Sequence, residues 1–337
     1  MLGHKQILTS HFGVKKCVKI RRTEEDVRRL LHLAKLDEED LKPVVQSFYL
    51  AQDFTREDLK LMEVTPDILN QILEGERVII RGDKSDPAVL CTDTQTYDIK
   101  EAGTSNSLLL LPSVVWPDEA ETNDKDDGIT IASQEVAGIF HNYLELHLCR
   151  PRVQKLRYLM EENLYTGKEY EADNVDVKYT FEDLLNVIQA SPKELQTALR
   201  ELQACCIDGF WRMLDFDYQF SVFNHIVNLV DSNSWPSDGI PLQAVLDTLE
   251  DLIPRKILEE CFHWYTEPVG RTTPEGYDLY RWNEDKICAF LGEVILRPTG
   301  KFNLEEFLYT WQSTVPEGIT TNLNQLKVGN LALSSTD

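Results

Sequence analysis

The sequence has no phosphate-binding glycine motif: neither G-x-x-x-x-G-K-[ST] nor G-x-G-x-x-G occurs among its 337 residues. These motifs supply the backbone amides that hold nucleotide phosphates, so a nucleotide-driven enzyme is not expected. A G-x-S-x-G nucleophile elbow is also missing, and the 7 histidines do not group with cysteines or carboxylates at metal-ligand spacings. We therefore predict a protein that is not an enzyme and that uses no cofactor or metal.

Long hydrophobic runs and paired cysteines are scarce as well. No apolar run approaches the ~20 residues of a membrane-spanning helix, so no membrane association is expected. The 7 cysteines are odd in number, irregularly spaced and without a C-x-x-C, which favours reduced thiols in a cytosolic or nuclear protein. We interpret Cys205 and Cys206, at the end of a predicted helix, as packed small residues, and His263, in a predicted aromatic strand, as structural.

Positive charge is in short supply. There are 34 Lys and Arg against 57 Asp and Glu, which gives a net charge of -23 and disfavours a free-standing nucleic-acid binder. Residues 118–127 are predicted to be an acidic loop without regular structure. The first 22 residues carry six Lys or Arg and no acid, a pattern that fits either a mitochondrial presequence or a disordered basic start.

The sequence before residue 150 predicts several short strands and two helices. Residues 23–36 predict a helix capped by Thr23, and residues 65–74 predict a short helix that ends at Gly75. Strands are predicted at residues 48–50, 59–64, 78–80, 88–91, 95–100 and 143–148.

The most apolar short stretch is a run of four leucines followed by Pro112. A run of this length bounded by turn residues predicts a strand buried on both faces. In residues 143–148, leucines alternate with other residues, which predicts a last strand whose inward side chains are Leu144, Leu146 and Leu148. The candidate barrel-strand residues for partner binding are Leu108, Leu109, Leu110, Leu111, Leu144 and Leu146. Such short strands predict a small β-barrel, which either closes internally or is completed by strands of another chain.

After Pro151 the pattern becomes helical and repeats. Pro192, Pro254 and Pro316 lie 62 residues apart, and each precedes an apolar helix face that follows two other predicted helices. The first two copies end in aromatic strands, at residues 207–214 and at residues 262–265 paired with 277–282. Three helices and a hairpin in about 60 residues is the winged-helix plan, here as tandem small domains.

The predicted fold class is therefore α+β, with a small N-terminal β-barrel region followed by tandem winged-helix modules. The expected divisions are an extension and helix (1–46), the barrel (47–149), and modules at 150–215, 216–284 and, incomplete, 285–337.

One basic run opens the first module and is the candidate DNA contact: Arg150, Arg152, Lys155 and Arg157. A winged helix that reads DNA directly should carry a basic third helix. Here Lys193 and Arg200 are offset by Glu194 and Glu201, which favours protein-binding or structural surfaces.

Several stretches, in order along both halves, carry a family resemblance. They are residues 78–84 (VIIRGDK), 88–91 (AVLC), 96–98 (TYD), 104–109 (TSNSLL), 178–185 (KYTFEDLL), 302–307 (FNLEEF) and 313–318 (STVPEG). Over residues 23–327 the chain resembles the Dcc-type sister chromatid cohesion proteins, which are non-catalytic subunits of the alternative, cohesion-linked replication factor C clamp loader.

The resemblance implies a nuclear protein of DNA replication and the cell cycle. It implies a shared triple β-barrel with a small companion subunit and the C-terminal tail of the clamp loader's large subunit. It also implies docking on the catalytic subunit of DNA polymerase epsilon, for which the same basic run is a candidate contact. The family continues past the point where this sequence stops, so contacts by the last module are the least certain expectation. The alternative, from another class, is a winged-helix transcription regulator that binds DNA.

Overall fold

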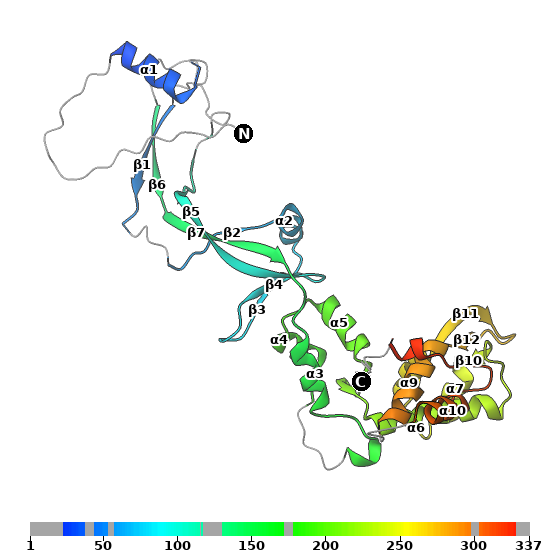
Figure 1. The fold of residues 1–337 in the computed structure, drawn as a ribbon. Helices are drawn as coiled ribbons and strands as arrows, with labels where there is room; N and C mark the ends of the chain where they lie inside the picture. Colours follow the sequence, from blue (N-terminus) through cyan, green and yellow to red (C-terminus); the bar gives the residue numbers. More distant parts are fainter. Residues whose placement is uncertain are drawn as a thin grey trace. The chain divides into compact units, whose positions relative to one another are not determined.

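The computed structural model describes residues 23–37, 44–52, 57–114, 116, 130–171, 178–297 and 303–327. Within these ranges the chain has a mixed α+β fold with ten α-helices and a curled five-stranded sheet (Figure 1), which confirms the α+β class. It separates into two compact units, one from Met1–Leu73 and Asp98–His147 and the other from Glu74–Tyr97 and Leu148–Asp337. The acidic loop at 118–127 and the basic start lie outside the described residues.

Two helices of the first unit begin where the sequence predicts. Helix α1 (Glu24–Ala34) starts with a capping box, in which Thr23 Oγ1 accepts from Asp26 N at 3.2 Å and Thr23 N donates to Asp26 Oδ2 at 2.9 Å. Helix α2 (Pro66–Leu73) has proline at its first position, where no backbone donor is needed, and buries Ile68.

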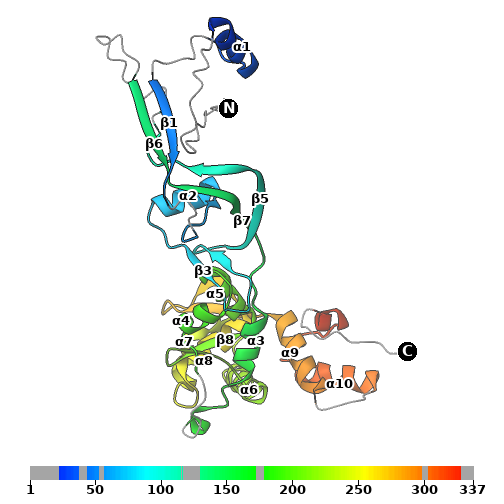
Figure 2. The same ribbon diagram turned by 90° about the vertical axis from the view of Figure 1, so that its left-hand side faces the viewer.

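The strands from β1 to β7 form two sheets. Strands β1 (Val44–Leu50) and β6 (Thr130–Val136) pair in parallel as a sheet of their own. The larger sheet has the order β2-β7-β5-β4-β3. Its strands are β2 (Met62–Glu63), β3 (Ile79–Arg81), β4 (Val89–Cys91), β5 (Thr96–Leu110) and β7 (Gly138–Leu148). The strands β5 and β7 are the two long, curved arrows in Figure 2.

The leucine run departs from its prediction in two ways. It is the end of the single 15-residue strand β5, not a separate strand, because the residues around Gly103 continue the strand instead of turning the chain. None of the four leucines is buried, and Leu108 is 36% exposed, so burial on both faces was wrong. The inward placement of Leu148 was also wrong, because it is 65% exposed at the end of β7.

The second unit repeats a sequence of helices and a hairpin. Helices α3 (Gln154–Glu161), α4 (Phe181–Val187) and α5 (Pro192–Glu201) precede the hairpin of β8 (Ala204–Ile207) and β9 (Phe210–Met213), with a short 3-10 helix at Lys168–Tyr170 between α3 and α4. Helices α6 (Phe216–Ser232), α7 (Leu242–Leu249) and α8 (Arg255–Tyr265) precede β11 (Thr266–Thr272) and β12 (Asp278–Trp282), with β10 (Ile240–Pro241) beside β12. Helices α9 (Glu284–Leu296) and α10 (Leu304–Thr314) follow.

Two hydrophobic cores hold this unit together. The first is built from α3, α4 and α5 around Leu156, Leu184 and Leu195, all with no exposed surface. The second extends to the 3-10 helix Leu323–Lys327, includes Phe223 and Trp311, and also contains Tyr165, Cys205 and Leu214. The two later helix groups therefore share one core, to which the hairpin region of the first group also contributes.

Three local predictions in this unit were wrong. Cys205 and Cys206 lie in β8, because Gln203 takes a left-handed conformation (φ 53°) that ends the helical segment before them. His263 lies on α8, which continues to Tyr265, and the first hairpin strand begins only at Thr266.

The third repeat also differs from its prediction. Among the described residues no α-helix follows Pro316, because the chain turns there and Gly318 adopts φ +90°, a left-handed conformation incompatible with helix propagation; only the 3-10 helix Leu323–Lys327 forms. Of the three apolar positions expected on that helix, two pack inward, since Ile319 is 4% and Leu326 is 1% exposed, whereas Leu323 is 42% exposed. The predicted hydrophobic face was therefore only partly correct, and the predicted α-helix was wrong.

Candidate partner-binding strands and basic cluster

Strand β5 is paired along only part of one edge. Strand β4 has three residues and joins β5 through a tight turn in which Thr92 N donates to Gln95 O at 3.0 Å, so it reaches only the first residues of β5. On the other side, β7 accompanies β5 to its end, where Ala137 N donates to Leu110 O at 2.9 Å. Beyond β4, no described strand covers that edge of β5. Long unpaired edges of this kind accept strands from other chains.

The candidate leucines lie along this incompletely covered region. Leu109, Leu110 and Leu111 are half-buried, and so are Leu144 and Leu146 on the neighbouring strand β7. Fully burying a leucine side chain stabilises a structure by about 1.5–3 kcal/mol, so each half-buried leucine retains free energy that a covering surface would recover. The region has the apolar character of an interaction surface.

The parallel pair of β1 and β6 is a second incomplete element. Phe48 is 6% exposed and Val136 has no exposed surface, whereas Tyr49 is 52% and Leu50 is 48% exposed. Parallel strands normally occur inside larger sheets with both faces covered, and two isolated strands are marginally stable. The apolar side chains left in solvent on β1 indicate that this pair also needs additional cover.

The four residues of the basic run are brought to the start of α3, but they have different surroundings. Arg152 is a structural residue, since its guanidinium donates to Pro87 O at 3.1 Å and to Gln189 Oε1 at 2.9 Å. Arg157 pairs with Glu161 one helical turn later, at 3.5 Å. Arg150 and Lys155 are exposed, and Lys155 lines a small cavity. Only part of the run is therefore available for an external ligand.

A buried polar junction, not anticipated from the sequence, fixes the start of β5 to helix α5. Thr96 Oγ1 donates to Glu194 Oε2 at 2.6 Å and accepts from Ser191 N at 3.0 Å, and neither Thr96 nor Ser191 has exposed surface. Burial raises the pKa of the nearby Cys91 thiol, although the Thr96 hydrogen bond opposes this. The capping-box spacing of Ser191 and Glu194 was the sequence signal for this junction.

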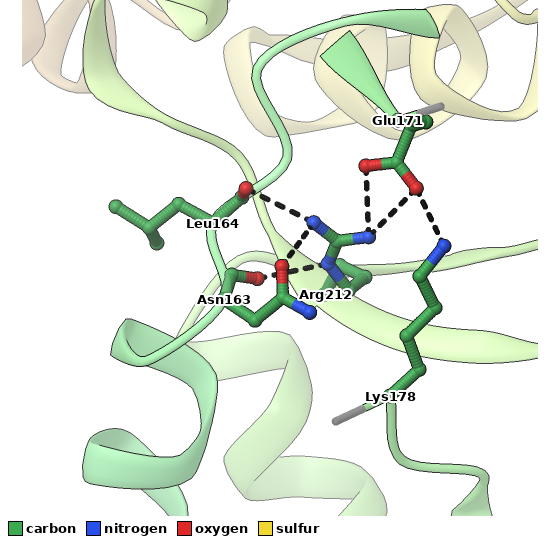
Figure 3. A network of polar contacts seen from close by, with 5 residues as sticks. All are labelled: Asn163, Leu164, Glu171, Lys178 and Arg212. Atoms are coloured by element: carbon green, nitrogen blue, oxygen red, sulfur yellow. Dashed lines mark hydrogen bonds and ion pairs between the residues drawn. The ribbon is translucent and has the colours of Figure 1, made fainter. Parts of the chain in front are cut away.

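A second network that the sequence reasoning missed centres on Arg212 in β9 (Figure 3). Its guanidinium is 4% exposed and donates to Asn163 O at 2.8 Å, Asn163 Oδ1 at 2.6 Å and Leu164 O at 3.0 Å. It also pairs with Glu171 at 3.1 Å, and Glu171 pairs with Lys178 at 2.7 Å. These contacts hold the segment around Asn163 and Leu164 against strand β9.

Comparison with known proteins identifies the chain. The family of sister chromatid cohesion protein Dcc1 matches residues 59–337. Sister chromatid cohesion protein DCC1 of Xenopus tropicalis is 44% identical over 309 residues, which cover 91% of this chain and 78% of the relative. The chain belongs to the Dcc1 family. The DCC1 protein of Homo sapiens is 40% identical over 313 residues, covering 91% of this chain and 78% of the relative.

More distant members match with similar coverage. A probable DCC1 protein of Dictyostelium discoideum is 26% identical over 309 residues, covering 86% of this chain and 76% of the relative. In this Dcc1-family chain, no helix among the described residues is long and apolar enough to cross a membrane. Within the same ranges, no three His, Cys, Asp or Glu side chains gather as a metal site.

The described cysteines of the Dcc1-family chain are all free thiols. Cys205 and Cys261 have no exposed surface, and burial raises the pKa of both thiols above its ordinary value. Burial likewise raises the pKa of Cys288 to about 11. Thiols in this state are poor nucleophiles, which favours the interpretation of Cys205 as a packing residue.

Proposed function

We propose that this Dcc1-family chain is an accessory, non-catalytic subunit of an alternative, cohesion-linked replication factor C clamp loader that acts in DNA replication. Family membership supports a role in sister chromatid cohesion, and such a role places the proposed site of action in the nucleus. The observation that carries the proposal is the uncovered edge of β5 with its half-buried leucines, which is the surface of a subunit that needs partners.

Residues 47–149 form the proposed partner-binding domain. Strands from the C-terminal tail of the clamp loader's large subunit and from the small companion subunit pair with the free edges and cover Leu108, Leu109, Leu110, Leu111, Leu144 and Leu146. The curled sheet supports this, because it is half of a barrel and lacks strands of its own to close. The separate parallel sheet of β1 and β6 also supports the proposal, because two strands alone need additional cover.

The second unit is the proposed docking part, built from winged-helix modules at 150–215, 216–284 and 285–337. The succession of three helices and an antiparallel hairpin, present twice, supports this assignment. These modules bring the clamp loader to the catalytic subunit of DNA polymerase epsilon. Arg150, Lys155 and Arg157 are the proposed polymerase or DNA contacts in this part, with Arg152 as their structural support.

A winged-helix transcription regulator is the weaker alternative, and the charges on the third helices argue against it. On α8, Lys256 pairs with Glu259 at 3.1 Å and with Glu260 at 3.2 Å. Arg255 pairs with Asp247 at 3.1 Å and also with Glu250. Cations neutralised in this way contribute little to phosphate binding. The surfaces are therefore better suited to protein partners.

Co-expression tests the proposed function. The chain is produced with and without the large-subunit tail and the companion subunit, and the products are compared by size-exclusion chromatography. A stoichiometric complex of all three polypeptides is expected. If the chain elutes as a folded monomer and does not bind either partner, the proposal is wrong.

A further inference from the structure

A small polar cavity lies in the second unit, where strand β3 meets helices α3 and α4. Its volume is about 160 Å³. It is lined by Arg81, Gly82 and Asp83 from the end of β3, by Lys155 from α3, and by residues 186–189 at the end of α4. This volume is below the roughly 300–1,000 Å³ of cofactor and drug-sized sites, so it suits a single side chain.

The cavity has an unsatisfied donor in its wall. The Nε atom of Arg81 is buried, and among the described residues it has no hydrogen-bond partner, although another nitrogen of the same guanidinium donates to Leu185 O. A buried N–H without an acceptor costs about 1–3 kcal/mol, so the Arg81 side chain is incompletely satisfied where it lines the cavity. Lys155 adds a second cation, and no ion pair of Lys155 occurs among the described residues.

The shape of the cavity depends on a glycine. Gly82 adopts φ +154°, and a Cβ atom there would lie 3.2 Å from Gln189 Nε2 and 3.2 Å from Ala88 Cα. Gln189 itself is fixed, because its Nε2 donates to Pro87 O at 2.7 Å and its Oε1 accepts from Arg152 at 2.9 Å. The polar wall is therefore held rigidly before any ligand arrives, which lowers the entropy cost of binding.

The charge balance selects the type of anion. Two cations and the Asp83 carboxylate line the cavity, which leaves a net charge of about one positive unit. A carboxylate carries one negative charge and would neutralise this lining, whereas a phosphate monoester carries nearly two and would leave the filled cavity negatively charged. The lining therefore matches one aspartate or glutamate side chain better than a phosphate.

The strand beside the cavity indicates how such a side chain is presented. Strand β3 is at the end of the five-stranded sheet, and no described strand pairs with its outer edge. Ile80 is 60% exposed, whereas its neighbours Ile79 and Arg81 are half-buried. A free edge with an exposed apolar side chain suits an extended peptide that adds as a strand, with its alternate side chains in adjoining pockets.

We propose that this cavity binds one acidic side chain of an extended segment of another polypeptide, which adds to the outer edge of β3. Arg81 and Lys155 hold the carboxylate, and Ile80 packs against an apolar neighbour in the segment. The site uses the outer edge of β3 and not the edge of β5.

Fluorescence anisotropy with the full chain at physiological salt tests the proposal. The probes are a labelled extended peptide with one glutamate between valines and threonines, the same peptide with glutamine, and an oligothymidylate of about 12 nucleotides. The variants are Lys155→Gln, Lys155→Arg and the control Lys193→Gln, which removes an equally exposed cation on α5 outside the cavity. Lys155 is exposed, so its replacement should leave folding intact.

The glutamate peptide should bind more tightly than the glutamine peptide. Lys155→Gln should weaken glutamate-peptide binding by about 2- to 5-fold, as expected for one partly exposed ion pair, and leave the glutamine peptide unchanged. Lys155→Arg and Lys193→Gln should retain the wild-type preference. Equal affinity for the two peptides, no measurable binding of either, or a Lys155→Gln effect confined to the oligothymidylate would each overturn the proposal. The last result would identify a nucleic-acid contact instead.

Discussion

Arg212 and Glu171 form an ion pair in which the arginine is almost completely buried and the carboxylate is partly exposed. The guanidinium Nη1 lies 3.1 Å from Glu171 Oε1, and the side chains are 5% and 24% exposed. The same arginine holds the backbone of Asn163 and Leu164 (Figure 3). The pair therefore ties the loop after α3 to strand β9.

Replacing Arg212 with Ala should lower the free energy of unfolding by about 3–5 kcal/mol, because it removes a buried ion-pair partner and leaves several acceptors unsatisfied. Thermal and urea unfolding of the two proteins measure the difference. The matched control is Arg157→Ala, which breaks the exposed pair with Glu161 and should cost under about 1 kcal/mol. Equal losses in the two variants would contradict the structural role of Arg212.

The same pair predicts a pH dependence of stability. Burial alone would raise the pKa of Glu171, but hydrogen bonds and charge from Lys178 and Arg212 outweigh it and lower the pKa below its ordinary value of 4.5. A carboxyl group whose pKa is lower in the folded state stabilises the fold above the unfolded pKa, and this contribution is lost as pH falls through the folded pKa.

Glu171→Gln should therefore be less stable than the wild type at pH 7, and the difference should shrink as the pH falls below about 4.5. Urea unfolding across this range measures it. A difference that stays constant down to pH 3 would show that the carboxylate charge does not contribute.

Gly292 on helix α9 is predicted to be intolerant of a side chain. A Cβ atom there would overlap Leu326 Cδ2 and lie 3.4 Å from Trp311 Nε1, and both neighbours are buried. Gly292→Ala should destabilise the chain by about 1–3 kcal/mol, despite the better helix propensity of alanine. In the double variant with Leu326→Ala the new methyl group has room, so the two losses should be less than additive. Strict additivity in unfolding experiments would contradict this packing.

The sequence was most informative where a local interaction fixes the structure. Thr23 was recognised as a cap because its side chain accepts from the backbone three residues later, a contact that needs no tertiary partner. Thr180 caps α4 in the same way. The Asp208–Gly209 turn between β8 and β9 is equally local, since both residues adopt positive φ. Such features can be predicted from a few neighbouring residues.

The errors occur where distant residues decide the outcome. The burial of the leucine run depends on how far β4 extends along β5, which no pattern within residues 107–112 contains. The arrangement of the third repeat depends on how Ile319 and Leu326 pack into a core shared with α9 and α10. Arg212 could have been noticed as a cation inside an aromatic strand, but its acceptors lie about 40 residues away and could not be identified.

The basic run predicts weak DNA binding by the isolated chain. Replacing Arg150, Lys155 and Arg157 together with Glu should abolish whatever salt-sensitive binding is present, because these three cations are the part of the run directed to solvent. Arg152→Glu alone should instead lower the melting temperature, since it breaks the contacts with Pro87 and Gln189. Tight DNA binding at physiological salt that survives the triple replacement would refute the assignment.

The last prediction concerns the leucines of β5. Leu110 is only partly buried in the isolated chain, so Leu110→Asp should lower the stability of the free protein by about 1–2 kcal/mol, less than the cost in an assembled barrel. In a completed barrel the same carboxylate would be buried without a partner, at a cost of several kcal/mol, and assembly with the tail and companion subunit should fail. Tyr309→Asp is the matched control, because Tyr309 is 79% exposed on α10 and lies outside the proposed barrel. Pull-down of both partner polypeptides, together with thermal melting of each variant, separates the two effects. Partner capture retained by Leu110→Asp, or lost equally with Tyr309→Asp, would show that the β5 edge is not where the partners bind.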